Sequence, residues 1–480
     1  MNHKVVTYAL GWVLFFEGCF LFLPFLVGLC YQEYREAFSF LGVAGGCALI
    51  GWLITRFRPK DMNLFAREGY VIVAFSWLIL SLFGAIPFML TGSISNFMDA
   101  IFETASGFTT TGASILASPE DMPKCINFWR TFTHWIGGMG VLVFMMAVIP
   151  LAGGRNMFLM KAESPGPTVG KFVPKVKSSA KILYSIYLVM TILQVVFLMF
   201  GGLSLFDSVT AAFGTAGTGG FGVYNDSIGG FSTYCQVIIT IFMIAYGVNF
   251  SFYYLVFVAR KPKEALKIKE VWIYLTVIAG SILLITCQVR PQFLGWGETL
   301  KHAAFQVGSI VTTTGYSTVD FDQWPAFSKT ILFFLMFMGA CAGSTGGGMK
   351  VSRFMIWVKT FLKELKVMIH PRNVYKVKVA GQKVEHEVLR SVNVFLVSYM
   401  IIFIVSVLLI SLDGYDFETN VSAVAATINN IGPGFKLVGP TCNYSGFSTF
   451  STAVLIFDMI AGRLELFPLL LLFSPTTWKK

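Results

Sequence analysis

Long apolar segments alternate with short polar or basic segments along the whole 480-residue chain. The longer ones reach the roughly 20 residues that a helix needs to cross about 30 Å of hydrocarbon. We predict ten membrane-crossing helices, the least regular at residues 328–342. The ten apolar runs lie near residues 7–30, 37–55, 70–91, 126–152, 182–203, 233–259, 271–288, 328–342, 391–412 and 449–474.

The composition supports an integral membrane protein. The chain is 55% hydrophobic and 13% charged, whereas a soluble globular protein carries about 25% charged residues. The first apolar run contains Glu17 and lacks a small-residue cleavage site, so we expect a membrane helix rather than a signal peptide. The eight cysteines stand singly without a CxxC pair, which indicates neither a zinc site nor a disulfide framework.

The net charge of +11 is unevenly distributed, because most basic residues fall in alternate loops. Such a bias is typical of cytoplasmic loops, so we expect these loops and both termini in the cytoplasm. The opposite loops are short and relatively acidic. We therefore expect the basic charge to orient the protein and to contact anionic membrane lipids or an acidic partner, and we expect no nucleic-acid binding. The basic segments are 56–67, 155–181, 260–269, 350–390 and 479–480.

Four short segments, called here the glycine segments, recur at intervals of roughly 100 residues between apolar runs. Acidic residues lie about three helical turns before three of them, where they complement the positive end of a helix. The third unit departs from this pattern, with Lys301 and His302 in place of an acid, although Glu298 is close. The segments read Thr109-Thr110-Thr111-Gly112, Ala216-Gly217-Thr218-Gly219, Thr312-Thr313-Thr314-Gly315 and Asn429-Asn430-Ile431-Gly432.

Non-helical backbone at membrane depth is tolerated only where it is buried in protein or lines a watery cavity. Rings of carbonyl oxygens can replace the hydration shell of a monovalent cation. We therefore predict an all-α integral membrane protein with four helix–pore-loop–helix repeats around one central pore, plus an N-terminal helix pair. The predicted boundaries are 1–68 for the helix pair and 69–155, 180–260, 270–365 and 388–475 for the repeats.

Residues 339–350, called here the glycine loop, interrupt an apolar run with five glycines between Gly339 and Gly348. Each glycine disfavours a helix by about 1 kcal/mol relative to alanine, so we expect a broken helix. Arg463 lies in the last apolar run and is predicted to face the pore or to pair with Glu465 or Asp458. Glu103 is expected to be a structural hydrogen-bonding partner.

Other classes of protein fit less well. Residues 217–222 match GxGxxG, but a dinucleotide site needs this motif between a strand and a helix of a soluble unit. Scattered histidines and the lack of a nucleophile–base pair speak against an enzyme. An inverted-repeat secondary transporter is the other rival, but the charge pattern gives all four repeats one orientation.

Further motifs accompany the glycine segments: Gly219–Phe221, Thr313–Tyr316, Cys341–Lys350, Thr427–Gly434 and Gly462–Glu465. Together they resemble the TrkH/KtrB family of bacterial potassium uptake proteins over essentially the whole chain, and the N-terminal helix pair favours the TrkH branch. The resemblance implies a selectivity filter that binds K⁺ through backbone carbonyls, and a gate below it. The implied filter residues are Thr110, Thr111, Gly112, Thr218, Gly219, Thr313, Thr314, Gly315, Asn430, Ile431 and Gly432, and the implied gate residues are Gly343, Ser344, Thr345, Gly346, Gly347, Gly348, Lys350 and Arg463.

The resemblance also implies K⁺ uptake across the bacterial inner membrane by a homodimer. A cytoplasmic TrkA-like nucleotide-binding ring is the expected regulatory partner, with residues 359–383 as a docking surface. No cofactor is expected in this chain, and the nucleotide belongs to the partner. The alternatives are K⁺ symport with H⁺ or Na⁺ and a less selective K⁺/Na⁺ transporter. Extra glycine in the second segment, at Gly217, is expected to soften that quarter of the filter.

Overall fold

The computed structural model describes the chain except for residues 61, 63–64, 149–175, 374, 380–381 and 480. The described part is helical, as predicted, apart from one small antiparallel hairpin of β1 (Lys378–Val379) and β2 (Gln382–Lys383). The end of the first predicted repeat, from residue 149, and residues 155–175 of its basic loop lie outside the described residues.

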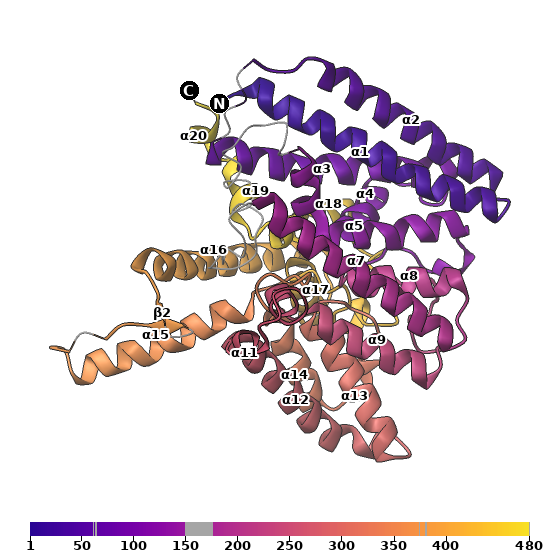
Figure 1. Ribbon diagram of the computed structural model, residues 1–480. Coiled ribbons are helices and arrows are strands. Elements are labelled where there is room, and N and C mark those ends of the chain that lie inside the picture. The colour runs from indigo at the N-terminus through magenta and orange to yellow at the C-terminus, as the bar shows by residue number, and fades with distance from the viewer. Residues whose placement is uncertain (61, 63–64, 149–175, 374, 380–381, 480) are drawn as a thin grey trace.

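Two long helices, α1 (His3–Cys30) and α2 (Tyr34–Arg56), form the predicted N-terminal pair along one side of the molecule (Figure 1). Small residues allow their backbones to approach closely. A Cβ atom built on Gly18 would lie 2.7 Å from the Ala44 carbonyl oxygen, and one on Gly51 would lie 2.5 Å from the Phe15 nitrogen. Close backbone approach at small residues is typical of helix packing in membranes.

The rest of the chain repeats one order four times: a long helix, a short helix and a further helix. In chain order the four units are α3 (Ala66–Thr91), α4 (Phe97–Phe108) and α5 (Lys124–Val148); α7 (Val176–Phe200), α8 (Leu205–Ala216) and α9 (Thr233–Tyr246); α12 (Lys269–Val289), α13 (Trp296–Val311) and α14 (Ala326–Phe337); and α16 (His386–Ile410), α17 (Phe417–Ile428) and α18 (Thr449–Arg463).

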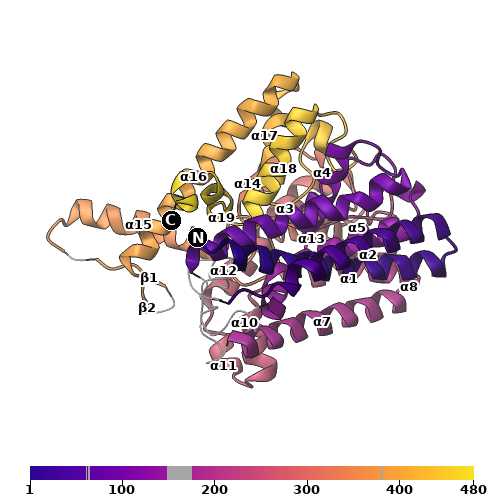
Figure 2. The same cartoon turned by 90° about the horizontal axis from the view of Figure 1, so that it is seen from above.

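Shorter elements join or follow these units. Helix α15 (Val351–Ile369) projects away from the body together with the hairpin (Figures 1 and 2). The other connecting elements are α10 (Phe250–Tyr253), a π-helical turn (Tyr254–Val258), α11 (Pro262–Ala265), α19 (Phe467–Leu472), α20 (Pro475–Trp478) and 3-10 turns at Pro119–Asp121, Arg290–Gln292, Phe321–Gln323, Ser411–Asp413 and Lys436–Val438.

Within the described residues, six helices are long and apolar enough to cross a membrane, or seven if one bent pair counts as a span. The sequence predicted ten. Of the four other apolar runs, the one at 126–152 continues past Val148 into residues outside the described part of the chain, and the remaining three are not single straight helices. The run at 233–259 bends by 93° between α9 and α10. The run at 328–342 ends as helix at Phe337, and the run at 449–474 divides into α18 and α19.

All four short helices begin with an acidic residue in the first turn, namely Asp99, Asp207, Glu298 and Glu418. The third unit therefore does not depart from the pattern: α13 begins at Trp296, which puts Glu298 in the first turn and His302 in the second. Burial lowers the pKa of His302 to about 4. The His302 ring is thus neutral near pH 7 and does not oppose the acid.

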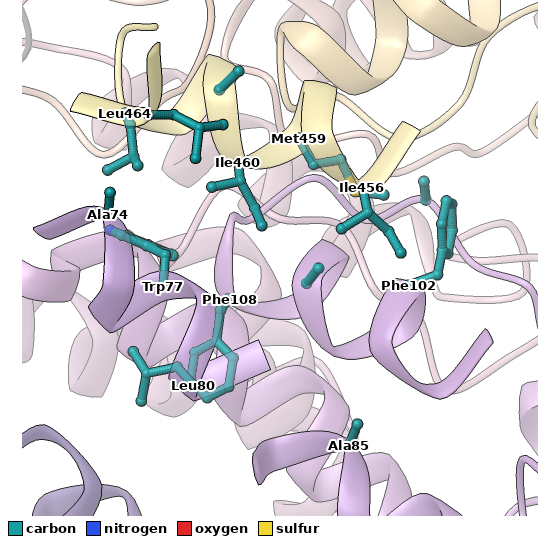
Figure 3. Packing of buried hydrophobic residues seen from close by; sticks show 14 of the residues in the cluster. Ala74, Trp77, Leu80, Ala85, Phe102, Phe108, Ile456, Met459, Ile460 and Leu464 are labelled. Carbon is teal, nitrogen blue, oxygen red and sulfur yellow. The ribbon is translucent and has the colours of Figure 1, made fainter. Parts of the chain in front are cut away.

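The four units pack in a closed circle. Each short helix contacts the last helix of the preceding unit: α8 packs on α5, α13 on α9, α17 on α14, and α4 on α18. Figure 3 shows the closing contact, where Ile456 of α18 lies beside Phe102 of α4. The ends of the four short helices are thereby brought to one place.

Candidate functional site

Each short helix ends in the same four-residue turn. The second residue of every turn has a positive φ between 54° and 59°, and a glycine two residues later has a positive φ between 77° and 96°. In every turn the third residue donates its backbone N–H to the carbonyl oxygen five residues earlier, at 2.8 or 2.9 Å. The four turns are 109–112, 217–220, 312–315 and 429–432.

The second turn corrects the predicted register. Thr218 has the positive φ that Thr110, Thr313 and Asn430 have, so Gly220 is the counterpart of Gly112. Gly219 instead occupies the position of Thr111, Thr314 and Ile431. The predicted equivalence of Gly219 with the other three glycines is therefore wrong by one residue. Sequence alone could not fix this register, since several of residues 217–222 are glycines and the end of α8 was unknown.

The glycines close a ring through direct contact with the next turn. A Cβ atom built on Gly112 would lie 1.9 Å from the Gly219 carbonyl oxygen. The same construction on Gly220 meets the Thr314 oxygen at 2.0 Å, on Gly315 the Ile431 oxygen at 1.9 Å, and on Gly432 the Thr111 oxygen at 2.7 Å. Four carbonyl groups from four turns are thus held side by side, and a side chain at any of these glycines would collide with one of them.

The side chains of these turns are buried, and many bond to one another. Thr109 and Thr111 join their hydroxyls at 2.8 Å, as Thr312 and Thr314 do at 2.7 Å. The Asn430 amide donates to Thr111 Oγ1 at 3.0 Å, which ties the fourth turn to the first. Within the described residues, Thr110 Oγ1 and Asn430 Oδ1 are buried oxygens without a hydrogen-bond donor.

His134 on α5 explains the extra glycine in the second turn. Its Nδ1 atom lies 2.7 Å from the Gly107 carbonyl oxygen, and its Nε2 atom accepts from the Phe221 N–H at 3.1 Å. A Cβ atom on Gly219 would lie 2.3 Å from the imidazole ring, and one on Gly217 would lie 2.2 Å from the His134 carbonyl oxygen. The glycines therefore permit tight packing, contrary to the expected softening.

A buried ion pair stands behind the first and second turns. Arg130 Nε donates to Glu103 Oε1 at 2.8 Å, and both side chains are almost fully buried. Glu103 also accepts from the Ser114 hydroxyl at 3.0 Å, so it is the structural partner predicted. The Arg130 guanidinium reaches the Gly222 carbonyl oxygen at 3.2 Å and lies over the Phe221 ring. The pair thus links the non-helical segments that follow two neighbouring turns.

Sequence reasoning missed Arg130, and it assigned His134 no particular role. A signal was present, because two polar residues one helical turn apart interrupt an otherwise apolar run. It also missed Tyr444 and assigned no role to Tyr316 of the motif Thr313–Tyr316, although both tyrosines fix the outer ends of turns. Tyr444 donates its hydroxyl to the Gly432 carbonyl oxygen at 2.7 Å, and Tyr316 donates to the Phe221 carbonyl oxygen at 3.3 Å.

The glycine loop lies directly against the third and fourth turns. The Gly347 N–H donates to Thr313 Oγ1 at 2.6 Å, and a Cβ atom on Gly347 would lie 2.8 Å from the Asn429 carbonyl oxygen. Gly343 and Gly348 have positive φ, so both positions favour glycine. The Ser344 hydroxyl donates to the Cys341 carbonyl oxygen at 2.7 Å inside the loop. The predicted broken helix is confirmed.

Two basic side chains hold the glycine loop. Lys350 is buried and donates its ammonium to the Gly346 carbonyl oxygen and, at 3.3 Å, to that of Gly347. Arg463 donates to the Thr345 carbonyl oxygen at 3.1 Å and to that of Gly137 at 2.5 Å. Arg463 therefore bridges the loop and α5 across the circle of units.

The two acids named as alternative partners of Arg463 have other contacts. Glu465 forms an ion pair with Arg353 at 2.5 Å, and Asp458 accepts from the Ser406 hydroxyl at 2.7 Å. No cluster of three His, Cys, Asp or Glu side chains suited to a metal ion exists among the described residues. Any cation at the four turns must therefore be held by carbonyl, hydroxyl and amide oxygens.

Comparisons with known proteins agree with this geometry. A family model described as "TrkH: Cation transport protein" matches residues 42–296 and 293–480. The chain is 35% identical to the Trk system potassium uptake protein TrkH of Salmonella typhimurium, and 31% identical to TrkG of Escherichia coli. These alignments cover 100% and 99% of both chains, respectively.

A solved structure shares the fold as well. The crystal structure of the potassium transporter TrkH from Vibrio parahaemolyticus superposes with a TM-score of 0.90 at 32% sequence identity, covering 100% of both chains. Family model, full-length relatives and structure thus agree, and this chain belongs to the TrkH family of cation transport proteins.

Proposed function

We propose that this protein takes up K⁺ across the bacterial inner membrane through a pore at the four glycine turns. The observation that supports this proposal most directly is the ring at the four turns. In this ring each glycine lies against a carbonyl group of the next turn, and the four glycines are Gly112, Gly220, Gly315 and Gly432. Carbonyl oxygens at close quarters replace the water around a K⁺ ion. The relatives named as potassium uptake proteins support K⁺ as the cargo and transport, rather than catalysis, as the activity.

The selectivity filter comprises the predicted filter residues with Gly220 added. The carbonyl groups that lie against the glycines belong to Thr111, Gly219, Thr314 and Ile431. The unpartnered oxygens of Thr110 and Asn430 add further oxygen ligands for the ion. The proposed units are the predicted ones, an N-terminal helix pair at 1–68 and pore repeats at 69–155, 180–260, 270–365 and 388–475.

The gate is the glycine loop together with Arg463. The loop contacts Thr313 and the Asn429 backbone of the filter, so it occupies the exit of the ion path. The positive groups of Lys350 and Arg463 are held beside that path by backbone carbonyls and would repel a cation while the loop stays in place. The opening of the pore therefore requires the loop to move.

Passive conduction and coupled symport remain separate candidates for the driving force. Membrane potential supplies about 2.3 kcal/mol per charge per 100 mV, which is enough to concentrate K⁺ without a coupling ion. Conduction driven by voltage is therefore the simpler mechanism. Symport with H⁺ or Na⁺, or weaker K⁺/Na⁺ discrimination, is the alternative.

The basic loops and both termini face the cytoplasm in this proposal, because of their charge. The protein works as a homodimer with a cytoplasmic TrkA-like ring that carries the nucleotide. Residues 359–383 form the docking surface. Exposed basic groups there, Lys366 and Arg372 among them, suit an acidic partner or anionic lipid headgroups.

The test is ⁸⁶Rb⁺ uptake into liposomes that hold the purified protein, with voltage as the driving force and K⁺ or Na⁺ as competitor. Uptake blocked by K⁺ and barely by Na⁺ supports a selective passive pore. Uptake that needs a proton or Na⁺ gradient supports symport. Equal block by both ions would contradict a K⁺-selective filter. If the protein is silent alone, the same assay is repeated with the cytoplasmic partner.

A further inference from the structure

One carboxylate outside the glycine loop accepts hydrogen bonds from both sides of the run from Gly343 to Gly348. Glu270 lies in the first turn of α12, and its Oε1 atom accepts the backbone N–H of Ala342 at 2.7 Å and that of Ser352 at 3.1 Å. One N–H precedes the run from Gly343 to Gly348, and the other follows it. Hydrogen bonds to an ionised acceptor are about twice as strong as neutral ones. A single side chain therefore ties a residue of the loop to the first turn of α15.

The opposite side of the loop fits into the bend between α9 and α10. The Cys341 N–H donates to the Gly247 carbonyl oxygen at 3.0 Å, and the Phe250 N–H donates to that of Gly343 at 3.0 Å. The Thr345 hydroxyl reaches the Tyr246 carbonyl oxygen at 3.4 Å. The 93° bend thus frees backbone groups of the second unit, and the glycine loop of the third unit satisfies them.

Helix α12 bonds to both the end of α9 and the glycine loop. Four residues after Glu270, Tyr274 donates its hydroxyl to the Ile244 carbonyl oxygen at 3.1 Å. Gly247 lies against the same hydroxyl, where a Cβ atom would come within 2.2 Å. Residues at this spacing share one face of a helix. One face of α12 therefore fixes the end of α9 through Tyr274 and the glycine loop through Glu270.

We propose that Glu270 is a positioning residue of the gate: it latches the glycine loop in the closed position, and opening breaks its two backbone hydrogen bonds. This inference rests on the proposed gating role of the loop. Glu270 directly follows the basic segment 260–269, much of which is exposed. A partner that pulls on this segment would turn or shift the first turn of α12 and release the latch.

The experiment compares the wild type with Glu270→Ala and Glu270→Gln in the full-length protein. One readout is voltage-driven ⁸⁶Rb⁺ uptake into liposomes without partner. The second is the labelling rate of Cys341, a buried thiol inside the loop, by a water-soluble maleimide, with peptide mass mapping to separate it from the other cysteines. Glu387→Ala is the matched control, since this acid also lies in the first turn of a long helix, α16, but is exposed.

We expect Glu270→Ala to raise both uptake and Cys341 labelling by more than about tenfold, because it loses two charged hydrogen bonds and one alone corresponds to about tenfold. Glu270→Gln keeps an oxygen acceptor but loses the charge, so about a threefold rise follows from the weaker bonds. Glu387→Ala should match the wild type. If Glu270→Ala misfolds, the nearly isosteric Gln variant decides.

Uptake and labelling rates equal to wild type in a folded variant would overturn the latch, as would lower uptake without faster labelling. Faster labelling with no ⁸⁶Rb⁺ uptake by any variant, even after the cytoplasmic partner is added, would leave the latch in place and reject the proposed pore. The two proposals can therefore fail separately.

Discussion

Glycine serves two purposes in the four turns. At Gly112, Gly220, Gly315 and Gly432 the backbone has a positive φ, which side chains rarely adopt, and the next turn leaves no room for a Cβ atom. At Gly219 φ is not positive, and glycine is needed because the His134 ring lies against it. The surplus of glycine in the second turn therefore reflects packing.

A Gly220→Ala substitution tests the corrected register. The new Cβ would lie 2.0 Å from the Thr314 carbonyl oxygen, so the carbonyl ring must distort. We expect the K⁺/Na⁺ flux ratio to fall by about tenfold, or about 1.4 kcal/mol of discrimination, and Gly315→Ser to act alike. Gly280→Ala is the control, because a Cβ on α12 there meets nothing within 4 Å. Unchanged selectivity in folded Gly220→Ala would contradict the assignment.

His302 gives the outer part of the third unit a pH dependence. Burial lowers its pKa to about 4, while the ring bonds to the Thr318 hydroxyl at 2.9 Å and stacks on Phe293. Above pH 6.5 the ring is neutral in both folded and unfolded protein, so stability is unaffected. Between pH 6.5 and about 4 only the unfolded chain gains the proton, and stability falls as the pH drops.

The measurement is the thermal unfolding midpoint in detergent at pH 7.5 and 5.0. The wild type should lose stability at the lower pH, and His302→Gln should lose less. An equal loss in both proteins would show that other groups cause the pH dependence.

At the scale of elements, the decisive features are where helices stop. The four short helices end at matched residues, which aims their C-terminal carbonyls, and with them a partial negative charge, at one place. The glycine loop and the α9–α10 bend are breaks that satisfy each other through backbone hydrogen bonds. Each break alone would leave polar backbone groups unpaired at membrane depth.

Deletion of residues 343–347 tests the loop as an element. The deletion removes the Thr345 carbonyl held by Arg463 and the Gly347 N–H that meets Thr313. We expect ⁸⁶Rb⁺ uptake to rise several-fold while K⁺ competition stays intact, since the turns themselves are untouched. Two results in a folded deletion protein would contradict the gate. One is a loss of uptake, and the other is unaltered uptake that still discriminates K⁺.

At the scale of the whole molecule, the circle of units leaves one arm outside. Helix α15 projects from the body (Figure 2) and exposes large apolar side chains, among them Phe361 at 62% and Met368 at 76%. Such a face favours burial against another protein surface. We propose that these apolar side chains meet a second copy of the chain in the homodimer, whereas the basic side chains of residues 359–383 meet the cytoplasmic ring.

Introducing charge on this arm should separate the copies. We expect Phe361→Glu combined with Met368→Glu to convert dimers to monomers in detergent, measured by light scattering or native mass spectrometry. Leu294→Glu is the control, because Leu294 is 97% exposed but lies on a different loop. A dimer that persists in the arm variant would place the interface elsewhere.

Much of this protein follows from its sequence by itself. Apolar length determined the membrane helices, since a helix must satisfy its own backbone in lipid. Glycine and threonine spacing located four turns, and the glycine run located a helix break. These are local properties, so local patterns sufficed for Gly112, Gly315, Gly432 and residues 339–350.

Only the tertiary structure decided the rest, because it depends on contacts between distant segments. The register of Gly220 follows from where α8 ends and from the Thr314 carbonyl of the next unit. The bend after Tyr246 is stable because the glycine loop, about a hundred residues later, takes up its free backbone groups. The Glu103–Arg130 pair and the Glu270 bonds likewise join residues that no sequence pattern connects.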